Sequence, residues 1–395
     1  MSNQLTHLQI KNFRSLADVK IQINPLNIIF GPNGAGKTTL LDTIWFVRDC
    51  AIRGVDLASS ERDHGIGLLW DAADEGENIS IKIVTPWGEY EVSFGYSSGR
   101  IEPFAGEKLF SDGDNQLIVR IIGSDKAQVY RTDLQELEFI TLREPEKLAL
   151  SRYVAFENSE PAASNIDNLL RVVRNYNSRS ASLFKIKRFG SESDSGERLQ
   201  DRCDNLWSVL RNLHDKRVID ERYDTIISFM QESFPAFDNL FFEQTGRYTV
   251  YGNFLEKGRR KPIRSSGVSD GHLQMLINLT ALFSEGQNRY ALILFDEPEI
   301  SLHPWALAVF AKAVKLATEK WNKQVFIATH SPVLISQFEP ENILTAELDK
   351  EGKTVLKRIS EIEGIQDLLE DYATGSLYMA EMIAPQSKSP LEVAS

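Results

Sequence analysis

The chain has little cysteine and no long hydrophobic run. Two cysteines, Cys50 and Cys203, occur among 395 residues, which excludes a disulfide framework and gives no cysteine spacing typical of a metal site. No apolar stretch approaches the roughly 20 residues that a membrane-spanning helix needs. The first residues lack the charged and apolar regions of a secretory signal. We therefore expect a cytoplasmic protein with two free thiols and no membrane partner.

The chain also lacks an excess of positive charge. It has 44 Lys and Arg against 56 Asp and Glu, a net charge of −12. This balance argues against indiscriminate coating of DNA, which depends on neutralising phosphates, but it is compatible with a local basic groove. The composition, 42% hydrophobic and 25% charged, is that of an ordinary globular protein, and the length suggests two or three domains.

A glycine-rich segment lies between a predicted strand and a predicted helix. Residues 26–30 are apolar, and helical spacing of apolar residues begins after Thr38. Between them, residues 31–38 read Gly-Pro-Asn-Gly-Ala-Gly-Lys-Thr, the P-loop (Walker A) pattern in its required context. The glycines let backbone N–H groups approach phosphates, Lys37 supplies a cation, and the Thr38 hydroxyl is a natural Mg²⁺ ligand. The predicted ATP contacts here are Asn33, Gly34, Ala35, Gly36, Lys37, Thr38 and Thr39.

An acidic pair follows a second apolar strand. Residues 292–295 predict a buried strand that ends at Asp296 and Glu297, where open α/β sheets place their ligands. We predict that Asp296 faces the Mg²⁺ shell as the Walker B residue and that Glu297 polarises the attacking water as general base. Glu299 is interpreted as orienting the loop. His330 follows another strand, residues 324–328, and is predicted to hydrogen-bond the γ-phosphate.

Residues 268–272, Val-Ser-Asp-Gly-His, open an amphipathic helix. A serine at such a position is ordinarily only a helix cap, worth about 1 kcal/mol. In company with the segments above, however, this one resembles the signature motif of ABC ATPases, in the Ser-Asp-Gly form of the RecF, OLD and SMC-like branch. The resemblance implies that Ser269 and Gly271 of one subunit bind the γ-phosphate held by the P-loop of a second copy. ATP would then join two heads, and hydrolysis would release them.

The resemblance to this branch covers roughly residues 1–60 and 240–345. Residues 11–16, Lys-Asn-Phe-Arg-Ser-Leu, look like the N-terminal strand of SMC and RecF heads, which implies that Arg14 reaches the nucleotide. Residues 301–304, Ser-Leu-His-Pro, resemble the D-loop, although His303 stands where transporters usually have Asp. No glutamine between residues 140 and 165 lies at a predicted strand end, so no Q-loop residue is assigned.

The periodicity predicts an α/β fold with a mostly parallel P-loop sheet, an N-terminal antiparallel β layer and a helical insertion. The resemblance implies that this fold is an ABC-ATPase-like head. Residues 78–132 alternate with period two, and residues 163–235 appear mainly helical, without the heptads of a coiled coil. We expect four parts. They are residues 1–160 (P-loop and β layer), 161–238 (helical insertion lobe), 239–345 (signature, Walker B, D-loop and His330) and 346–395 (C-terminal tail).

Two basic clusters are candidates for DNA contact, and a solvated surface is the alternative for each. The first precedes the signature and comprises Lys257, Arg259, Arg260, Lys261 and Arg264. The second lies in the predicted helical lobe, is interleaved with Tyr176, Phe184 and Phe189, and comprises Arg171, Arg174, Arg179, Lys185, Lys187 and Arg188. OLD proteins carry a C-terminal TOPRIM nuclease, for which the residues after His330 are too few. We therefore expect a stand-alone ATPase, with any cleavage performed by a partner effector such as a nuclease.

The leading hypothesis is a Mg²⁺-dependent ATPase that acts as a homodimeric switch in DNA repair or in antiviral defence against foreign DNA. One alternative is the nucleotide-binding subunit of an ABC transporter; the segment at residues 11–16, the long β layer and His303 count against it. Another is an ATP-dependent scaffold that does not hydrolyse, against which Glu297 and His330 argue.

Overall fold

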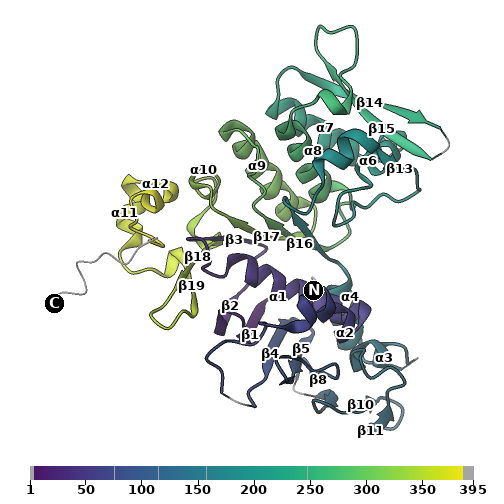
Figure 1. Ribbon diagram of the computed structural model, residues 1–395, viewed down its shortest axis with the longest axis vertical. Helices are drawn as coiled ribbons and strands as arrows, with labels where there is room; N and C mark the ends of the chain where they lie inside the picture. The colour runs from purple at the N-terminus through teal and green to yellow at the C-terminus, as the bar shows by residue number, and fades with distance from the viewer. Residues whose placement is uncertain (1–3, 75, 114, 157, 247, 386–395) are drawn as a thin grey trace.

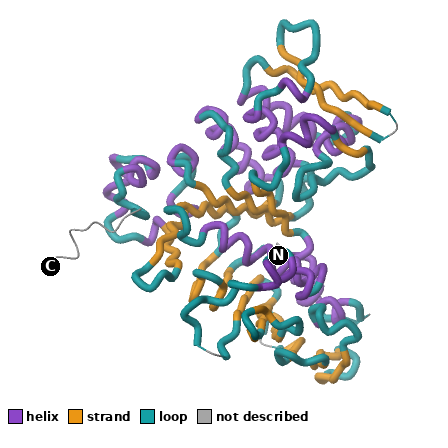
Figure 2. The backbone as a smooth tube through the Cα atoms, in the orientation of Figure 1, coloured by secondary structure: helices purple, strands orange, loops and turns teal. Residues whose placement is uncertain are grey.

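The computed structural model describes residues 4–385 apart from residues 75, 114, 157 and 247. Two large β-sheets dominate this part of the chain (Figure 1). In Figure 2 the strands of one sheet cross the centre of the molecule, the second sheet lies below them, and a mostly helical lobe lies above. This is the predicted α/β fold, with a mostly parallel sheet and an antiparallel layer.

The central six-stranded sheet carries the P-loop. Its order is β12-β16-β17-β3-β18-β19, with all neighbours parallel except β18 and β19. Every residue of β3, β16 and β17 is buried, because helices cover both faces of the sheet. The strands are β3 (Leu26–Phe30), β12 (Val173–Asn177), β16 (Ala291–Asp296), β17 (Lys323–Thr329), β18 (Ile343–Leu348) and β19 (Thr354–Arg358).

The central sheet separates two hydrophobic cores, one on each of its faces. Phe30 of β3 packs into one core with α8 (Asp270–Phe283) and α9 (Pro304–Lys320). The neighbouring Ile29 packs into the other core with α1 (Lys37–Arg53), the helix that the P-loop opens. The same core includes the antiparallel sheet, so α1 is enclosed between the two sheets. The N-terminal end of α1 is thereby held at the carboxyl end of β3.

The antiparallel sheet has eight strands in the order β11-β10-β9-β8-β5-β4-β1-β2. Alternate residues of β4 and β5 are buried, as period-two alternation predicts. The strands are β1 (His7–Phe13), β2 (Leu16–Gln22), β4 (Ile79–Thr85), β5 (Gly88–Phe94), β8 (Gly106–Ser111), β9 (Gln116–Arg120), β10 (Lys126–Arg131) and β11 (Glu136–Thr141). Short elements near this sheet are α2 (Val55–Ser60), η1 (Asp63–Gly65), β6 (Tyr96–Ser97), β7 (Arg100–Ile101), α3 (Ala149–Val154) and α4 (Pro161–Arg171).

The stretch predicted to be mainly helical contains a strand of the central sheet. β12 pairs in parallel with β16, from Val173 opposite Leu292 to Asn177 opposite Asp296. β12 does not form an apolar run in the sequence, because it contains polar residues. One of them, Arg174, is buried and forms an ion pair with Glu285. The remaining elements before α8 are α5 (Leu183–Phe189), β13 (Ser191–Glu192), α6 (Leu206–Asp215), α7 (Arg222–Ser233), β14 (Phe237–Thr245), β15 (Thr249–Glu256) and η2 (Ser265–Gly267).

The predicted tail also contributes to the core. Tyr378 packs edge-on against Phe30 at the end of β3. β18 begins at Ile343, just before the predicted tail, and pairs in parallel with β3 through residues 343–345. The other elements here are α10 (Pro332–Ile335), η3 (Pro340–Asn342), η4 (Ile359–Glu361), α11 (Ile365–Asp371) and α12 (Thr374–Met379). Residues 386–395 of the predicted tail lie outside the described residues. The four-part division of the chain stays a prediction.

The state of the cysteines and the length of the apolar helices can be read directly from the structure. Cys50 and Cys203 are both buried and free. In the part of the chain that the structure describes, no helix combines the length and apolarity needed to cross a membrane.

Candidate functional site

The P-loop, residues 31–38, connects β3 to α1 in a conformation that requires glycine. Gly31, Gly34 and Gly36 have φ values of +151°, +78° and +93°. A Cβ on Gly31 would lie 2.0 Å from the Ala346 carbonyl oxygen, and one on Gly36 would lie 2.3 Å from Thr354 Oγ1. The β18–β19 hairpin therefore closes over the loop. Only glycine permits both the backbone angles and this approach.

Lys37 is almost fully buried beneath the loop that precedes it. Its Nζ donates to the carbonyl oxygens of Gly31, at 2.9 Å, and Pro32, at 2.8 Å. Burial lowers the pKa of Lys37 from 10.5 to about 8, against the opposing attraction of Asp296 and Glu297. A bound polyphosphate would supply a stronger partner for this ammonium group. Along the loop, Asn33 and Gly34 are exposed, Ala35 is buried, and Thr39 is half-buried.

The Walker B carboxylate meets the first turn of α1. Thr38 Oγ1 donates to Asp296 Oδ1 at 3.0 Å, and Asn177 Nδ2 donates to Asp296 Oδ2 at 2.8 Å. Burial raises the pKa of Asp296, and the hydrogen bond from Thr38 opposes that rise. Hydroxyl and carboxylate oxygens are ligands that Mg²⁺ accepts. Among the described residues no group of three or more His, Cys, Asp or Glu side chains could hold a metal by itself.

Glu297 lies one residue beyond the strand, with φ of +52°. Arg179 Nε and Nη2 both donate to Glu297 Oε2, at 2.9 and 2.6 Å. The other oxygen, Oε1, lies 3.9 Å from His330 Nε2. Glu297 and His330 therefore lie together at the carboxyl ends of β16 and β17.

Glu299 holds the turn that carries His330. Glu299 Oε1 accepts hydrogen bonds from Thr329 Oγ1, at 2.7 Å, and from the His330 N–H, at 2.8 Å. Burial raises the pKa of the Glu299 carboxyl. Burial, followed by the positive charge of Lys37, lowers the pKa of His330 and so favours its neutral form. The contacts agree with an orienting role for Glu299.

The signature segment forms the tip of α8. Ser269 caps the helix, with Oγ accepting from the His272 N–H at 3.3 Å and lying 2.6 Å from His272 Nδ1. A Cβ on Gly271 would lie 2.6 Å from the Ser301 carbonyl oxygen, so this glycine lets the D-loop segment approach. His303 caps α9 by accepting from the Trp305 N–H. No hydrogen bond within the described part of the chain joins Ser269 or Gly271 to the P-loop.

Arg14 lies at the turn between β1 and β2, with φ of +49°. Its Nη1 lies 3.1 Å from Asp42 Oδ2, a carboxylate on α1 that Arg62 also contacts. The adjacent Ser15 accepts a hydrogen bond from Thr354 Oγ1 at 2.8 Å, beside Gly36. Arg14 is thus placed next to α1, and the residue that follows it, Ser15, lies beside Gly36 of the P-loop.

Two residues of the site were missed as site residues by the sequence reasoning: Asn177 and Arg179. Asn177 ends β12 and binds Asp296, and Arg179 binds Glu297. Both residues lie at or just after the end of a strand of the parallel sheet, which is where ligand-binding residues are expected. The sequence did not predict β12, however, and Arg179 was assigned only to the second basic cluster. A search for short strands with polar residues ahead of the signature would have found both.

The basic clusters are only partly free for a ligand. In the second cluster, Arg188 stacks over exposed Phe184, whereas its other members have acidic partners, and Tyr176 is buried. Those pairs are Arg171–Asp167, Arg174–Glu285, Arg179–Glu297, Lys185–Asp204 and Lys187–Asp270. Lys187 and Arg188 join Arg264 of the first cluster in lining a pocket of about 540 Å³. The fold therefore brings parts of both clusters to one face.

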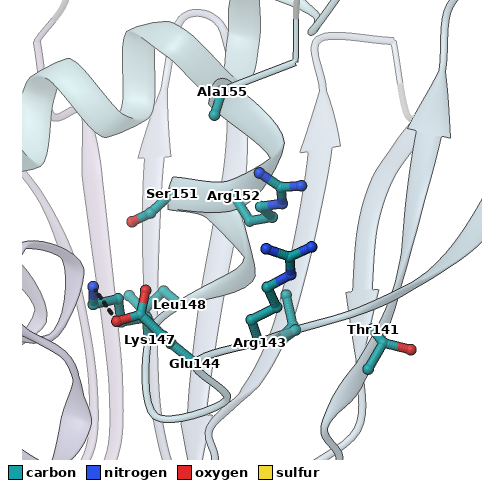
Figure 3. Close-up of a pocket in the computed structure, with 9 residues that line it drawn as sticks. Thr141, Arg143, Glu144, Lys147, Leu148, Ser151, Arg152 and Ala155 are labelled. Carbon is teal, nitrogen blue, oxygen red and sulfur yellow. Dashed lines mark hydrogen bonds and ion pairs between the residues drawn. The ribbon is translucent and has the colours of Figure 1, made fainter.

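A second pocket, of about 360 Å³, lies in the antiparallel lobe around α3. In Figure 3 Arg143 and Arg152 extend to the same side of the pocket, while Glu144 and Lys147 pair with each other. None of the predicted nucleotide-binding residues lines it. It is distinct from the P-loop site.

Comparison with known proteins places these features in a family. The family model described as "AAA domain, putative AbiEii toxin, Type IV TA system" matches residues 26–336. An OLD nuclease of Thermus scotoductus is 22% identical over 367 residues, which cover 90% of this chain and 64% of that protein. The DNA replication and repair protein RecF of Cronobacter sakazakii is 24% identical, covering 88% of this chain and 96% of the relative.

A solved structure shares the fold. The SmcHead bound to the C-winged helix domain of ScpA superposes with a TM-score of 0.57 at 13% identity, covering 90% of this chain and 98% of that one. This chain spans less than two thirds of the OLD nuclease, 64% of its length.

Proposed function

The chain belongs to the AAA-domain family matched over residues 26–336 and is an ABC/SMC-type ATPase of the RecF/OLD-like branch, and on this premise we propose that it hydrolyses ATP with Mg²⁺ as a homodimeric switch. The observation that carries the proposal is the hydrogen bond from Thr38 to Asp296. It brings the P-loop and the Walker B strand, which are far apart in the sequence, to one point. Residues 33–39 would surround the phosphates, and Arg14 would approach from the β1–β2 turn.

The residues around this point have complementary roles. Lys37 would turn from the Gly31 and Pro32 carbonyls to the terminal phosphates. Thr38 and Asp296 would hold Mg²⁺, which supplies charge neutralisation when bound. Glu297 Oε1 would accept a proton from the attacking water. The neutral His330, held by Glu299, would donate its ring N–H to the γ-phosphate.

The proposal assigns the remaining contacts to a second copy. Ser269 is exposed at the tip of α8. Its hydroxyl would turn from His272 Nδ1 and, with the Gly271 N–H, would bind a phosphate held by another subunit. Backbone N–H groups at a helix N-terminus favour an anion. Two such contacts, related by a two-fold axis, would close two ATP sites at once.

The test measures the molar mass in solution, with and without ATP, of variants that bind ATP but do not hydrolyse it. Glu297→Gln should bind Mg²⁺-ATP without turnover and form a dimer, measured by light scattering at micromolar protein. Ser269→Arg in the same background should bind ATP but stay monomeric, because its side chain would occupy the phosphate contact. A monomeric Glu297→Gln protein at saturating ATP would contradict the dimer, and absence of phosphate release by the wild type would contradict the ATPase.

The biological setting is proposed by analogy with the relatives. A protein similar to an OLD nuclease and to a DNA replication and repair protein fits a cytoplasmic role in DNA maintenance or defence, with DNA and an effector such as a nuclease as partners. The exposed Phe184, Phe189 and Arg188 on α5 are suited to stacking on bases and contacting phosphates. Arg188→Glu with Arg264→Glu should abolish DNA stimulation of turnover but retain basal turnover. Unchanged stimulation would exclude this face.

A further inference from the structure

The turn that follows β12 is hydrogen-bonded to two elements that carry predicted site residues, β16 and α8. Asn177 binds the Asp296 carboxylate, and its own Oδ1 accepts from the Arg179 N–H at 2.8 Å. The Ser178 N–H donates to the Asp296 carbonyl oxygen at 3.3 Å, and Ser178 Oγ accepts from Gln274 Nε2 at 3.2 Å. Because Gln274 lies on α8, the turn is fixed to both the Walker B strand and the signature helix.

This fixed turn aims the Arg179 side chain at the proposed base. Both donated bonds end on Glu297 Oε2, so that oxygen is engaged and the carboxylate plane is constrained. The backbone of Glu297 is itself in the left-handed region, at φ of +52°. Oε1 is left facing His330 at 3.9 Å.

We propose that Arg179 is a positioning residue for the proposed ATP hydrolysis: it holds Glu297 Oε2 so that Oε1 is presented to the attacking water beside His330. The inference rests on the proposed function. A proton-accepting group works only from a fixed geometry, and a displacement of about 1 Å can lower a rate 100-fold. Glu297 without Arg179 would sample several rotamers. The base would then be present but poorly aligned.

Two other roles for the same ion pair give different results. The Arg179 side chain is 72% exposed, and an ordinary surface ion pair contributes little, so its removal would leave turnover unchanged. A latch that withholds Glu297 from water would instead show faster turnover on removal. Only a positioning role predicts slower turnover with intact nucleotide binding.

The experiment compares Arg179→Ala and Arg179→Lys with wild type. For Arg179→Ala we expect kcat to fall about 10- to 100-fold, with KM for ATP and the Kd of a fluorescent ATP analogue within about threefold of wild type. Arg179→Lys should recover part of kcat, because the lysine ammonium group can still donate to Glu297 Oε2, although with one nitrogen in place of Nε and Nη2.

Arg131→Ala is the matched control, because Arg131 also donates from Nε and Nη2 to one carboxylate, that of Asp133, but belongs to β10 of the antiparallel sheet. Its basal kcat should equal that of wild type. If wild type hydrolyses ATP and Lys37→Ala does not, the proposed function stands independently. An Arg179→Ala kcat equal to or above that of Arg131→Ala, or a loss of analogue binding as large as that of Lys37→Ala, would overturn the positioning role.

Discussion

The buried ammonium group of Lys37 should destabilise the nucleotide-free protein, so a neutral substitute should stabilise it near neutral pH. The fall of the pKa from 10.5 to about 8 corresponds to roughly 3 kcal/mol against the charged form. Lys37→Met removes that charge but leaves the Gly31 and Pro32 carbonyls without a donor, at a loss of roughly 2 kcal/mol. We expect Lys37→Met to have a free energy of unfolding about 1 kcal/mol above wild type at pH 7.

The pH dependence follows from the direction of the pKa change. A folded-state pKa below the unfolded value means that the unfolded chain binds more protons between about pH 8 and 10.5, so wild type gains stability as pH rises through that window. Lys37→Met has no such gain. The free energies of unfolding of the two proteins should therefore be equal near pH 9, and wild type should be the more stable protein above that pH.

Urea unfolding of nucleotide-free protein at pH 7, 8, 9 and 10 measures this difference. Lys323 provides a matched control, because burial also lowers its pKa to about 8 and its Nζ also donates to two carbonyl oxygens, those of Gly286 and Arg289. Lys323→Met should show the same pH pattern and still bind ATP, whereas Lys37→Met should not bind it. A stability difference between Lys37→Met and wild type that stays constant from pH 7 to 10 would refute the reasoning.

Two further substitutions test contacts around the loop and the histidine. Gly36→Ala should lower the free energy of unfolding by about 1–3 kcal/mol more than Gly34→Ala, since both positions have positive φ but only at Gly36 would a Cβ meet Thr354. In thermal unfolding, adding Thr354→Ala to Gly36→Ala should recover part of this loss. Equal effects of the two glycine substitutions would contradict the contact. Glu299→Ala should lower the free energy of unfolding by about 1–3 kcal/mol, because the half-buried His330 N–H loses its acceptor. The same substitution should also reduce kcat. Glu299→Gln, which keeps an acceptor oxygen, should retain most of both, and an equally severe effect of Gln in phosphate-release and unfolding assays would argue that charge, not hydrogen bonding, matters.

The segments with local chemistry were predictable from the sequence. The P-loop was recognisable because a phosphate-binding loop needs glycines and a lysine at set spacings between a strand and a helix. β3, β16 and β17 were recognisable because strands buried on both faces are continuous apolar runs. The same pattern located Asp296 and Glu297 at a strand end.

The partners of these segments were decided by tertiary structure. β12 is rich in polar residues, and Arg174 and Asn177 are accommodated only because Glu285 and Asp296 approach from distant parts of the chain. The cover of the P-loop by Ala346 and Thr354 depends likewise on strand pairing over long sequence distances. Local periodicity reports which residues a strand buries, whereas the choice of neighbour follows from packing of the whole sheet. The sequence by itself therefore determined the ATPase motifs, and only the folded chain placed Arg179 on Glu297.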